Sequence, residues 1–374
     1  MPPTIDAIEL RAYRRPLDPP FHASWDPTPR RAHATTVVRV RAGGLEGVGA
    51  GDAMLGFAGH EGLFLGRSPL EIERHVAILD NLQFHYDRMW PLEVALWDLI
   101  GQIAGQPLWR LLGGSSGRMP LYASTGQRLD REARVAAVRR LQAEGFAAVK
   151  LRFFAEDPQD DIATVRAVRD AAPTLTLLCD ANQAWRMPWD TRPPWDLKQA
   201  RRVADALAEL DIYWLEEPLG RHDVRGLAEL RRQSQVRIAG GEGAREPIEL
   251  RRYLEHDALD VYQPDVVWST GVLRAVQIAR EVQARGAVYS PHTWGDGLVL
   301  LANLHVAAAV SHAPFIEFPY DPPHWTPERR DFILPAPIHA AAGHVTLPDA
   351  PGLGVALDWN ALEEWRVSEE GNPL

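Results

Sequence analysis

Acidic residues follow three consecutive apolar runs, each about as long as a short β-strand. Asp180 ends the first run, Glu216 ends the second, and Glu242 follows the third. Helical patterns separate these runs, so we expect them to form parallel strands of a βαβ series. The carboxyl ends of such strands meet at one face of a barrel, where three carboxylates repel one another unless a cation lies between them. The spacing therefore predicts a metal site.

Mg²⁺ is the ion that these ligands favour. Carboxylate oxygens are hard ligands that suit Mg²⁺, with Mn²⁺ as the other candidate. The single cysteine, Cys179, excludes a cysteine-based zinc cluster. As an alternative, each acid could cap the helix that follows it. For one acid the two explanations are equally good, but three acids on successive strands favour the metal.

A histidine and an aspartate end the next two apolar runs. Asp265 follows residues 261–264, and His292 follows residues 287–291. On neighbouring barrel strands the carboxylate would fix the imidazole tautomer and raise its basicity. Most of the 13 histidines are expected to be structural. The position of His292, rather than its residue type, predicts a catalytic base and hence an enzyme.

Two cations, Lys150 and Arg152, alternate along another apolar run. Side chains two residues apart on a strand lie on the same side, so both are expected in the barrel mouth, opposite His292. The alternative is a pair of surface cations. Charges inside an alternating strand series are unusual, which favours the functional interpretation.

The elements that would position these residues are eight strands, with helices after nearly all of them. This count predicts a closed parallel barrel. An open doubly wound sheet is the alternative, but no glycine-rich phosphate loop follows the first strand. The predicted strands cover residues 120–124, 146–152, 175–180, 212–216, 236–241, 259–264, 286–291 and 314–318. The predicted helices cover residues 132–144, 160–171, 198–210, 226–233, 247–256 and 272–285.

Around this barrel the sequence predicts two further parts. Residues 1–115 show strand patterns followed by helical patterns, which indicates an α+β capping domain with loops at 16–31 and 51–60. The barrel would span residues 116–325. Residues 326–374 are proline-rich, end in a short helical tail over 360–367, and are expected to pack back on the cap.

Composition excludes several classes of partner. The chain has 374 residues, a formal net charge of −10 and no block of Lys and Arg, so nucleic acid and anionic membranes are poor partners. The N-terminus lacks a signal-peptide pattern, and no apolar run approaches the ~20 residues of a membrane span. A cytoplasmic enzyme acting on a small molecule is the expectation.

Taken together, these motifs resemble the enolase superfamily, specifically its mandelate racemase subgroup. The resemblance covers essentially the whole chain and implies a modified TIM barrel of the (β/α)7β type with an N-terminal α+β cap, one Mg²⁺ per subunit, and a homo-oligomer. It implies that a base abstracts the proton α to a carboxylate of a small-molecule substrate. The matching motifs are Asp180-Ala-Asn182, Glu216-Glu217-Pro218, Gly241-Glu242, the Asp265 and His292 pair, Glu317 in the eighth strand, and the cap-helix signature over residues 95–114.

The resemblance also assigns roles to individual residues. It implies that Glu216 is the metal ligand of its pair, and we expect Glu217 to be a helix-start acid. It further implies that Glu317 acts as an acid that hydrogen-bonds the substrate carboxylate. Asn182 and Trp185 are predicted to bind substrate.

The sequence departs from the subgroup at Arg152, where the pattern carries a second lysine base. A guanidinium stays protonated, so it can bind a carboxylate or stabilise an enolate but cannot accept a proton. His292 then remains as a single base, with Lys150 helping to stabilise the ene-diolate, which predicts loss of a β-hydroxyl from an acid sugar, an aldonate or aldarate, to give a 2-keto-3-deoxy acid. Racemisation or epimerisation of a 2-hydroxy acid, with Lys150 as second base, and cycloisomerisation of a sugar lactone remain alternatives. The resemblance disfavours dipeptide epimerase and muconate cycloisomerase chemistry, because those relatives use a lysine near the sixth strand and residues 266–268 contain none.

Loops at the barrel mouth are expected to set specificity. Residues 183–198 form an insertion rich in Trp and Arg, which is interpreted either as a lid or as a subunit contact. The resemblance implies that two cap loops, 19–25 and 51–57, supply further substrate contacts; the alternative is that they simply pack the cap on the barrel. The candidates there are His22, Trp25 and Met54, and Arg152 together with the insertion arginines leans slightly toward a diacid.

Overall fold

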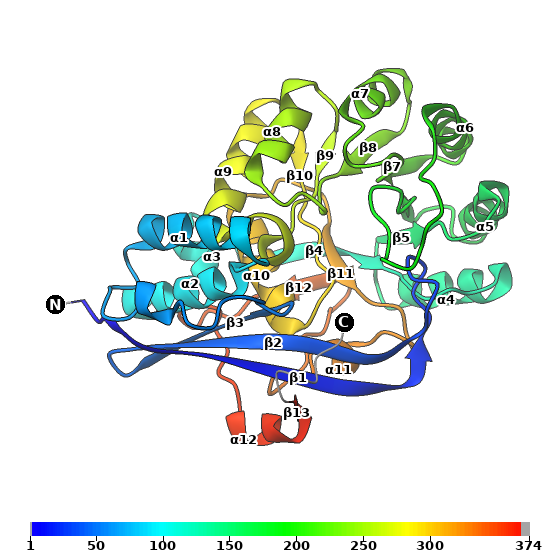
Figure 1. The fold of residues 1–374 in the computed structure, drawn as a ribbon. Coiled ribbons are helices and arrows are strands. Elements are labelled where there is room, and N and C mark those ends of the chain that lie inside the picture. The colour runs from blue at the N-terminus through cyan, green and yellow to red at the C-terminus, as the bar shows by residue number, and fades with distance from the viewer. Residues whose placement is uncertain (1, 368–374) are drawn as a thin grey trace.

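The computed structural model describes residues 2–367 of the chain. A capping domain begins with three antiparallel strands, in the order β1-β2-β3, and continues into helices that pack on the sheet. Figure 1 shows the long cap strands (blue) running along one side of the molecule, with the barrel on the other side. The cap elements are β1 (Ile5–Phe21), β2 (Arg30–Ala42), β3 (Leu45–Gly51), α1 (Ile72–His85), α2 (Trp90–Ala104) and α3 (Leu108–Leu111).

Strands and helices then alternate along residues 118–319, which confirms the predicted (β/α)7β barrel with its cap. Neighbouring strands from β4 to β10 pair in parallel, and β11 pairs with β4. The two ends of this ladder meet where the Ser290 hydroxyl donates to the Phe315 carbonyl at 3.2 Å. The strands are β4 (Arg118–Ser124), β5 (Ala148–Arg152), β6 (Thr176–Asp180), β7 (Ile212–Glu216), β8 (Arg237–Gly240), β9 (Val261–Tyr262), β10 (Val288–Tyr289) and β11 (Ile316–Pro319). The helices are α4 (Arg131–Ala143), α5 (Pro158–Ala171), α6 (Leu197–Ala208), α7 (Val224–Gln233), α8 (Pro247–Glu255), α9 (Gly271–Ala284) and α10 (Gly297–Val310).

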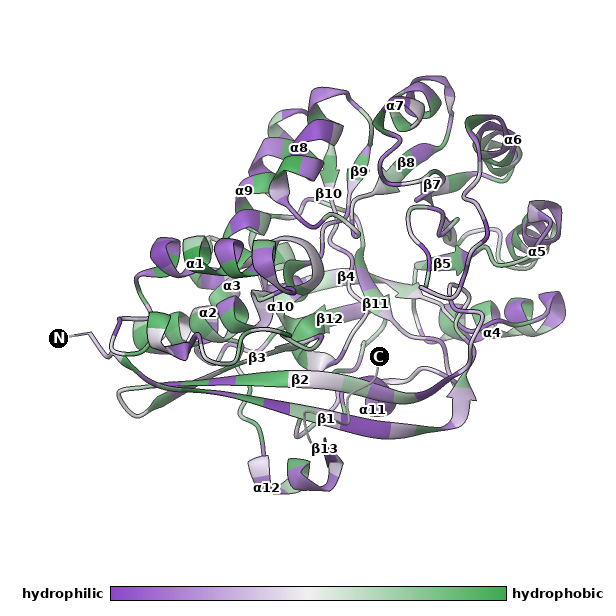
Figure 2. Ribbon diagram, in the orientation of Figure 1, coloured by the Kyte–Doolittle hydropathy of each residue, from purple (hydrophilic) through white to green (hydrophobic). Residues whose placement is uncertain are grey.

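The outer helices are amphipathic, which is why the sequence located them. Their apolar faces pack on the strands and their polar faces are exposed, and Figure 2 shows both colours on α4 to α8. Helix α10 is different because its residues are apolar all around, and nearly all of them are buried. It packs against cap, barrel and C-terminal residues at once, so it shows no helical periodicity and the sequence analysis did not predict it.

Two boundaries differ from the sequence expectation. Strand β1 continues to Phe21, although residues 16–31 are expected to form a loop. Beyond Tyr13 it pairs only with β2 and is an edge strand on its other side, where prolines such as Pro16 are tolerated. The predicted tail helix is also wrong in its last part. A single turn, α12 (Trp359–Leu362), leads through a 3₁₀ turn to β13 (Arg366–Val367), which pairs with β1.

The backbone of Leu353 links the C-terminal segment to the cap and to helix α10 of the barrel by hydrogen bonds. Its N–H donates to Asp98 Oδ1 at 2.7 Å, and the other oxygen of Asp98 accepts from Val48 N–H at 2.9 Å. Its carbonyl lies 3.2 Å from His305 Nε2, while His305 Nδ1 accepts from Trp109 N–H at 3.0 Å. Asp98, part of the cap-helix signature, therefore joins a cap strand to the C-terminal segment.

These contacts predict that His305 makes stability depend on pH. Burial lowers the pKa of His305 to about 4, whereas an unfolded histidine titrates near ~6.5. The unfolded state therefore gains protons first as the pH falls below 6.5, and stability is lost down to pH 4. Between pH 7.5 and 5.0 the loss from this residue should be about 2 kcal/mol. Urea unfolding of the wild type and of His305→Gln at both pH values measures it. The variant should lose less stability on acidification, and equal losses would contradict the assignment.

Within residues 2–367, no helix is both long enough and apolar enough to cross a membrane.

Candidate active site

Three buried carboxylates meet at the carboxyl ends of β6, β7 and β8. Asp180 and Glu216 are the last residues of their strands and are direct register partners, and Glu242 lies two residues beyond β8. One oxygen from each lies within 4.8 Å of the others. Their exposed fractions are 0%, 0% and 2%. The structure therefore brings the three predicted ligands together in a site closed to bulk water.

The donor set fits a hard divalent cation. Trp185 Nε1 donates to Glu242 Oε1 at 2.9 Å, but the buried Oε2 of Glu242 has no hydrogen-bond partner among residues 2–367. Burial, together with the charges of Asp180 and Glu317, raises the pKa of Glu216 to about 7 despite the nearby Lys150. A cluster whose buried negative charge is under-compensated is a cation site, and all of its ligand atoms are oxygens, as Mg²⁺ prefers.

The predicted cations of β5 are buried in the same place. The Lys150 ammonium is fully buried and lies 2.7 Å from Glu216 Oε1, 2.8 Å from Glu317 Oε1 and 3.8 Å from Asp180 Oδ2. The Arg152 side chain is 5% exposed. Their burial excludes the alternative of a surface pair.

Arg152 is immobilised by its surroundings. Its Nη1 lies 2.5 Å from Asp180 Oδ2, and its Nε donates to the Thr125 carbonyl at 2.9 Å. The guanidinium carbon also lies 4.6 Å from the ring centre of Trp25 and 5.2 Å from that of Trp294. Its donors are directed at protein acceptors, which leaves little freedom to reach a substrate in this arrangement.

His292 and Asp265 form the expected pair. His292 Nδ1 lies 3.0 Å from Asp265 Oδ2. The other oxygen of Asp265 accepts from Val267 N–H at 2.7 Å, Trp268 N–H at 3.0 Å and the Asn303 amide at 3.2 Å. The carboxylate oxygen accepts the hydrogen bond, so the imidazole donates to Asp265 from Nδ1. Nε2 lies 3.5 Å from Glu242 Oε2, at the metal site.

Neighbouring charged side chains shift the pKa values of both His292 and Glu317. Burial lowers the pKa of His292, but Glu242, Glu317 and Asp265 outweigh it and raise the value to about 9. Burial raises the pKa of Glu317, but Lys150, His292 and Arg152 outweigh it and lower the value to about 2. Glu317 also accepts from Thr293 N–H at 2.8 Å and the Ser124 hydroxyl at 2.6 Å. This setting favours the carboxylate, whereas the resemblance implies an acid.

The candidate substrate residues fall into two groups. Trp185 contacts Glu242, and Trp25 contacts Arg152, so both border the site. Asn182 borders it too, because its side-chain oxygen lies 3.5 Å from Arg152 Nη1 and its buried amide nitrogen has no hydrogen-bond partner in residues 2–367. Met54 packs in the core of the cap, and the His22 side chain is exposed, with only its backbone bonded to the barrel loop at Gln127.

The insertion after β6 contacts a cap loop of the same chain. Trp189 Nε1 donates to Asp26 Oδ1 at 2.9 Å, and the Trp189 side chain is 47% exposed. Trp195 packs on Phe153, the residue that follows Arg152 at the end of β5. These contacts favour the lid interpretation, and a subunit contact through the exposed part of the insertion stays a prediction.

Sequence reasoning was wrong about Glu217. It does not start a helix, because α7 begins at Val224 and is capped by Asp223. Glu217 has a positive φ of 47°, is 3% exposed, and neither carboxylate oxygen has a hydrogen-bond partner in residues 2–367.

Sequence reasoning also missed two tryptophans near the site. The ring centre of Trp268 lies 6.0 Å from that of His292, and Trp294 stacks on Arg152. Both follow a residue of the dyad by two or three positions, which is the signal that could have identified them.

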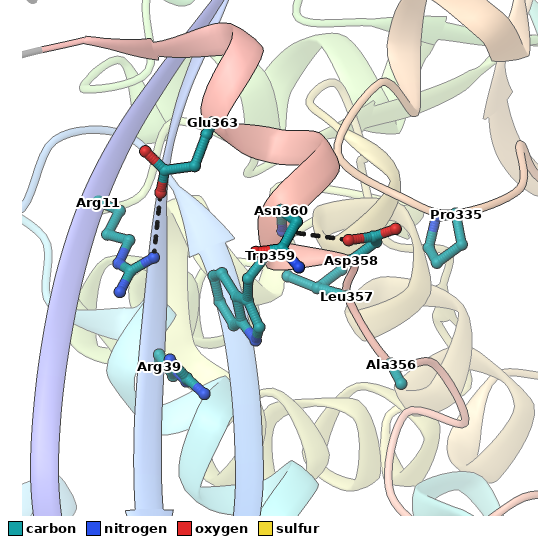
Figure 3. A pocket seen from close by; sticks show the side chains of 9 residues that line it. All are labelled: Arg11, Arg39, Pro335, Ala356, Leu357, Asp358, Trp359, Asn360 and Glu363. Atoms are coloured by element: carbon teal, nitrogen blue, oxygen red, sulfur yellow. Dashed lines mark hydrogen bonds and ion pairs between the residues drawn. The ribbon is translucent and has the colours of Figure 1, made fainter.

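One surface cavity of about 670 Å³ lies elsewhere, between the cap strands and α12 (Figure 3). Trp359 lies there beneath Arg11 and Arg39, at 5.3 and 4.7 Å from their guanidinium carbons. Arg11 pairs with Glu363 at 3.4 Å, and Arg39 pairs with Glu46 at 2.5 Å. None of the candidate catalytic or metal residues lines this cavity, so it is separate from the site at the strand ends.

Comparison with known proteins identifies the family. The chain is 28% identical to the D-galactarolactone cycloisomerase of Agrobacterium fabrum over 98% of this chain and 99% of that protein. It is 29% identical to the arabinonate dehydratase of Saccharolobus solfataricus over 74% of this chain and 71% of that one. A solved structure of a racemase from Streptomyces coelicolor A3(2) with bound magnesium superposes with a TM-score of 0.83 at 26% identity, covering 97% and 100% of the two chains. A family model described as "Enolase C-terminal domain-like" matches residues 132–361. The chain therefore belongs to the enolase superfamily, as a mandelate racemase-like member.

Proposed function

We propose that this protein is a Mg²⁺-dependent acid-sugar dehydratase that converts an aldonate or aldarate to a 2-keto-3-deoxy acid. The observation that carries the proposal is the asymmetry of the site. His292 directs Nε2 toward Glu242 at the metal site, whereas the cations opposite, Lys150 and Arg152, are each held by carboxylates of the protein. Such a site has one base and one face from which to remove a proton.

The residues have separate tasks in this reaction. Asp180, Glu216 and Glu242 would hold Mg²⁺, which when bound supplies positive charge next to the substrate carboxylate. Lys150 adds a fixed cation on the opposite side, which stabilises the charge that develops as the α-proton leaves.

His292 carries out the proton transfers. Its Nε2 accepts the α-proton, and the electron pair of the C–H bond moves into the ene-diolate. The β C–O bond then breaks, and protonated His292 returns the proton to the departing hydroxide, so that water leaves. The resulting enol becomes the 2-keto product. Asp265 keeps Nδ1 protonated and stabilises the imidazolium while it exists.

Cycloisomerisation of a sugar lactone is the second candidate. It needs the same proton abstraction but expels the ring oxygen instead of a hydroxyl. The nearly full-length similarity to a D-galactarolactone cycloisomerase favours it specifically.

One assay distinguishes these reactions. The protein is incubated with Mg²⁺ and a panel of aldonates, aldarates and their lactones, and 2-keto product and C2 epimer are scored. We expect keto product from an open-chain acid. Product from lactones alone would establish the second candidate, and epimer without keto product would contradict both.

A further inference from the structure

Arg88 lies in the turn between α1 and α2. These two helices face α9 of the barrel (Figure 1), and α2 contacts α9. Its side chain is only 13% exposed, and its guanidinium carbon lies 4.8 Å from the ring centre of Trp268. Its buried Nε has no hydrogen-bond partner in the described part of the chain. A buried donor without a partner is costly, so this guanidinium is set up for an acceptor that the protein itself does not provide.

No carboxylate among the described residues lies within hydrogen-bond distance of the Arg88 guanidinium. Asp52 Oδ2 lies 3.9 Å from Nη1, beyond hydrogen-bond range, and is 56% exposed, so this pair contributes little. Burial lowers the pKa of Arg88, the charge of Arg245 lowers it further, and Asp52, Asp87 and Asp265 offset this only in part. Arg245 is held nearby, where its carbonyl accepts from Gln83 of α1 at 2.8 Å.

The Trp268 side chain contacts both Arg88 and the proposed base, His292. The same indole lies 6.0 Å from the His292 ring, and its backbone N–H donates to Asp265 at 3.0 Å. Trp185, which donates to the metal-site carboxylate Glu242, packs on the edge of Trp268 at 5.6 Å.

The cap packs closely against the barrel at Val267, the residue before Trp268. A Cβ on Gly51 would approach Val267 Cγ1 to 2.5 Å, so any larger residue there would force Val267 to shift. Close packing therefore holds the cap against the segment that carries Trp268, the indole on which Arg88 stacks.

We propose that Arg88 binds the distal carboxylate of a diacid substrate whose proximal carboxylate lies at the three-acid cluster. This inference rests on the proposed function and narrows its substrate class to aldarates. A guanidinium forms two charge-assisted hydrogen bonds with a carboxylate, whereas the terminal hydroxyl of an aldonate offers neither charge nor a second acceptor. Arg88 is thus a specificity residue rather than a catalytic one.

Binding to an inactive protein tests Arg88 without requiring turnover. Mg²⁺-loaded His292→Asn is titrated calorimetrically with galactarate and with galactonate, which differ only at the distal carbon. The same titrations are made with Arg88→Met, which keeps the apolar stem, and with Arg88→Lys, which keeps the charge without the fork. Arg110→Met is the matched control, because Arg110 also stacks on a tryptophan of the cap, at 4.6 Å, but is 48% exposed.

We expect galactarate to bind at least about 10-fold more tightly than galactonate. Arg88→Met should remove this preference while changing galactonate affinity by less than about twofold. Arg88→Lys should keep part of the preference, and Arg110→Met all of it. Equal binding of the two acids, or a preference that survives in Arg88→Met, would overturn the proposal. If the Arg88-dependent preference is present but wild-type protein forms no keto product, the dehydratase function fails and the Arg88 site stands.

Discussion

Glu216→Gln is expected to lower Mg²⁺ affinity by about 100-fold or more, because it removes one of three charged ligands from a buried site. Lys150 retains Glu317 as a partner at 2.8 Å, so the fold should persist. Isothermal titration with Mg²⁺ measures the loss, and circular dichroism checks the fold.

The neighbouring residue supplies a matched control. Glu217→Gln changes an equally buried carboxyl that lines a different small cavity, with Leu219 and Tyr253, and forms no hydrogen bond in residues 2–367. Its Mg²⁺ affinity should stay within a few-fold of wild type. If Glu217→Gln lost Mg²⁺ binding and Glu216→Gln kept it, the choice of ligand within the pair would be wrong.

The second large effect is expected at His292. His292→Asn should lower kcat for keto-product formation by about 10³-fold or more, because the protein loses the group that accepts the α-proton. Lys150 and Arg152 cannot replace it, since carboxylates hold both cations. Mg²⁺ affinity should change little, because His292 is not among the three ligands.

His339→Asn is the control for this variant. His339 lies in the C-terminal segment with 60% of its side chain exposed, and its substitution should leave kcat unchanged. Residual keto-product formation by His292→Asn at more than about a tenth of the wild-type rate would show that another group accepts the proton.

Much of the site could be predicted because strand ends and residue types together determine it. Asp180, Glu216 and Glu242 each follow an apolar run, and parallel strands bring such positions to one face whatever the details of packing. The same reasoning placed Lys150 and Arg152 on one side of β5, where both are buried.

The rest depended on contacts between distant segments, which no local pattern encodes. Helix α10 is buried on all sides and lost the periodicity by which helices are recognised. Glu217 follows β7 with a positive φ, and its carboxylate is not part of the cluster of ligand oxygens that its neighbour Glu216 joins. Arg88 and Trp268 are 180 positions apart in sequence and meet only because the cap packs on the barrel.

Hydrogen exchange at the α-carbon tests one-base chemistry at His292 most directly. The probe is the 3-deoxy analogue of an acid that the panel identifies, because it cannot lose a β-hydroxyl and any enolate must be reprotonated. In D₂O with Mg²⁺, wild-type protein should introduce deuterium at C2 with retention of configuration, and His292→Asn should introduce none. Accumulation of the C2 epimer, or exchange that survives in His292→Asn, would contradict a single base on one face of the substrate.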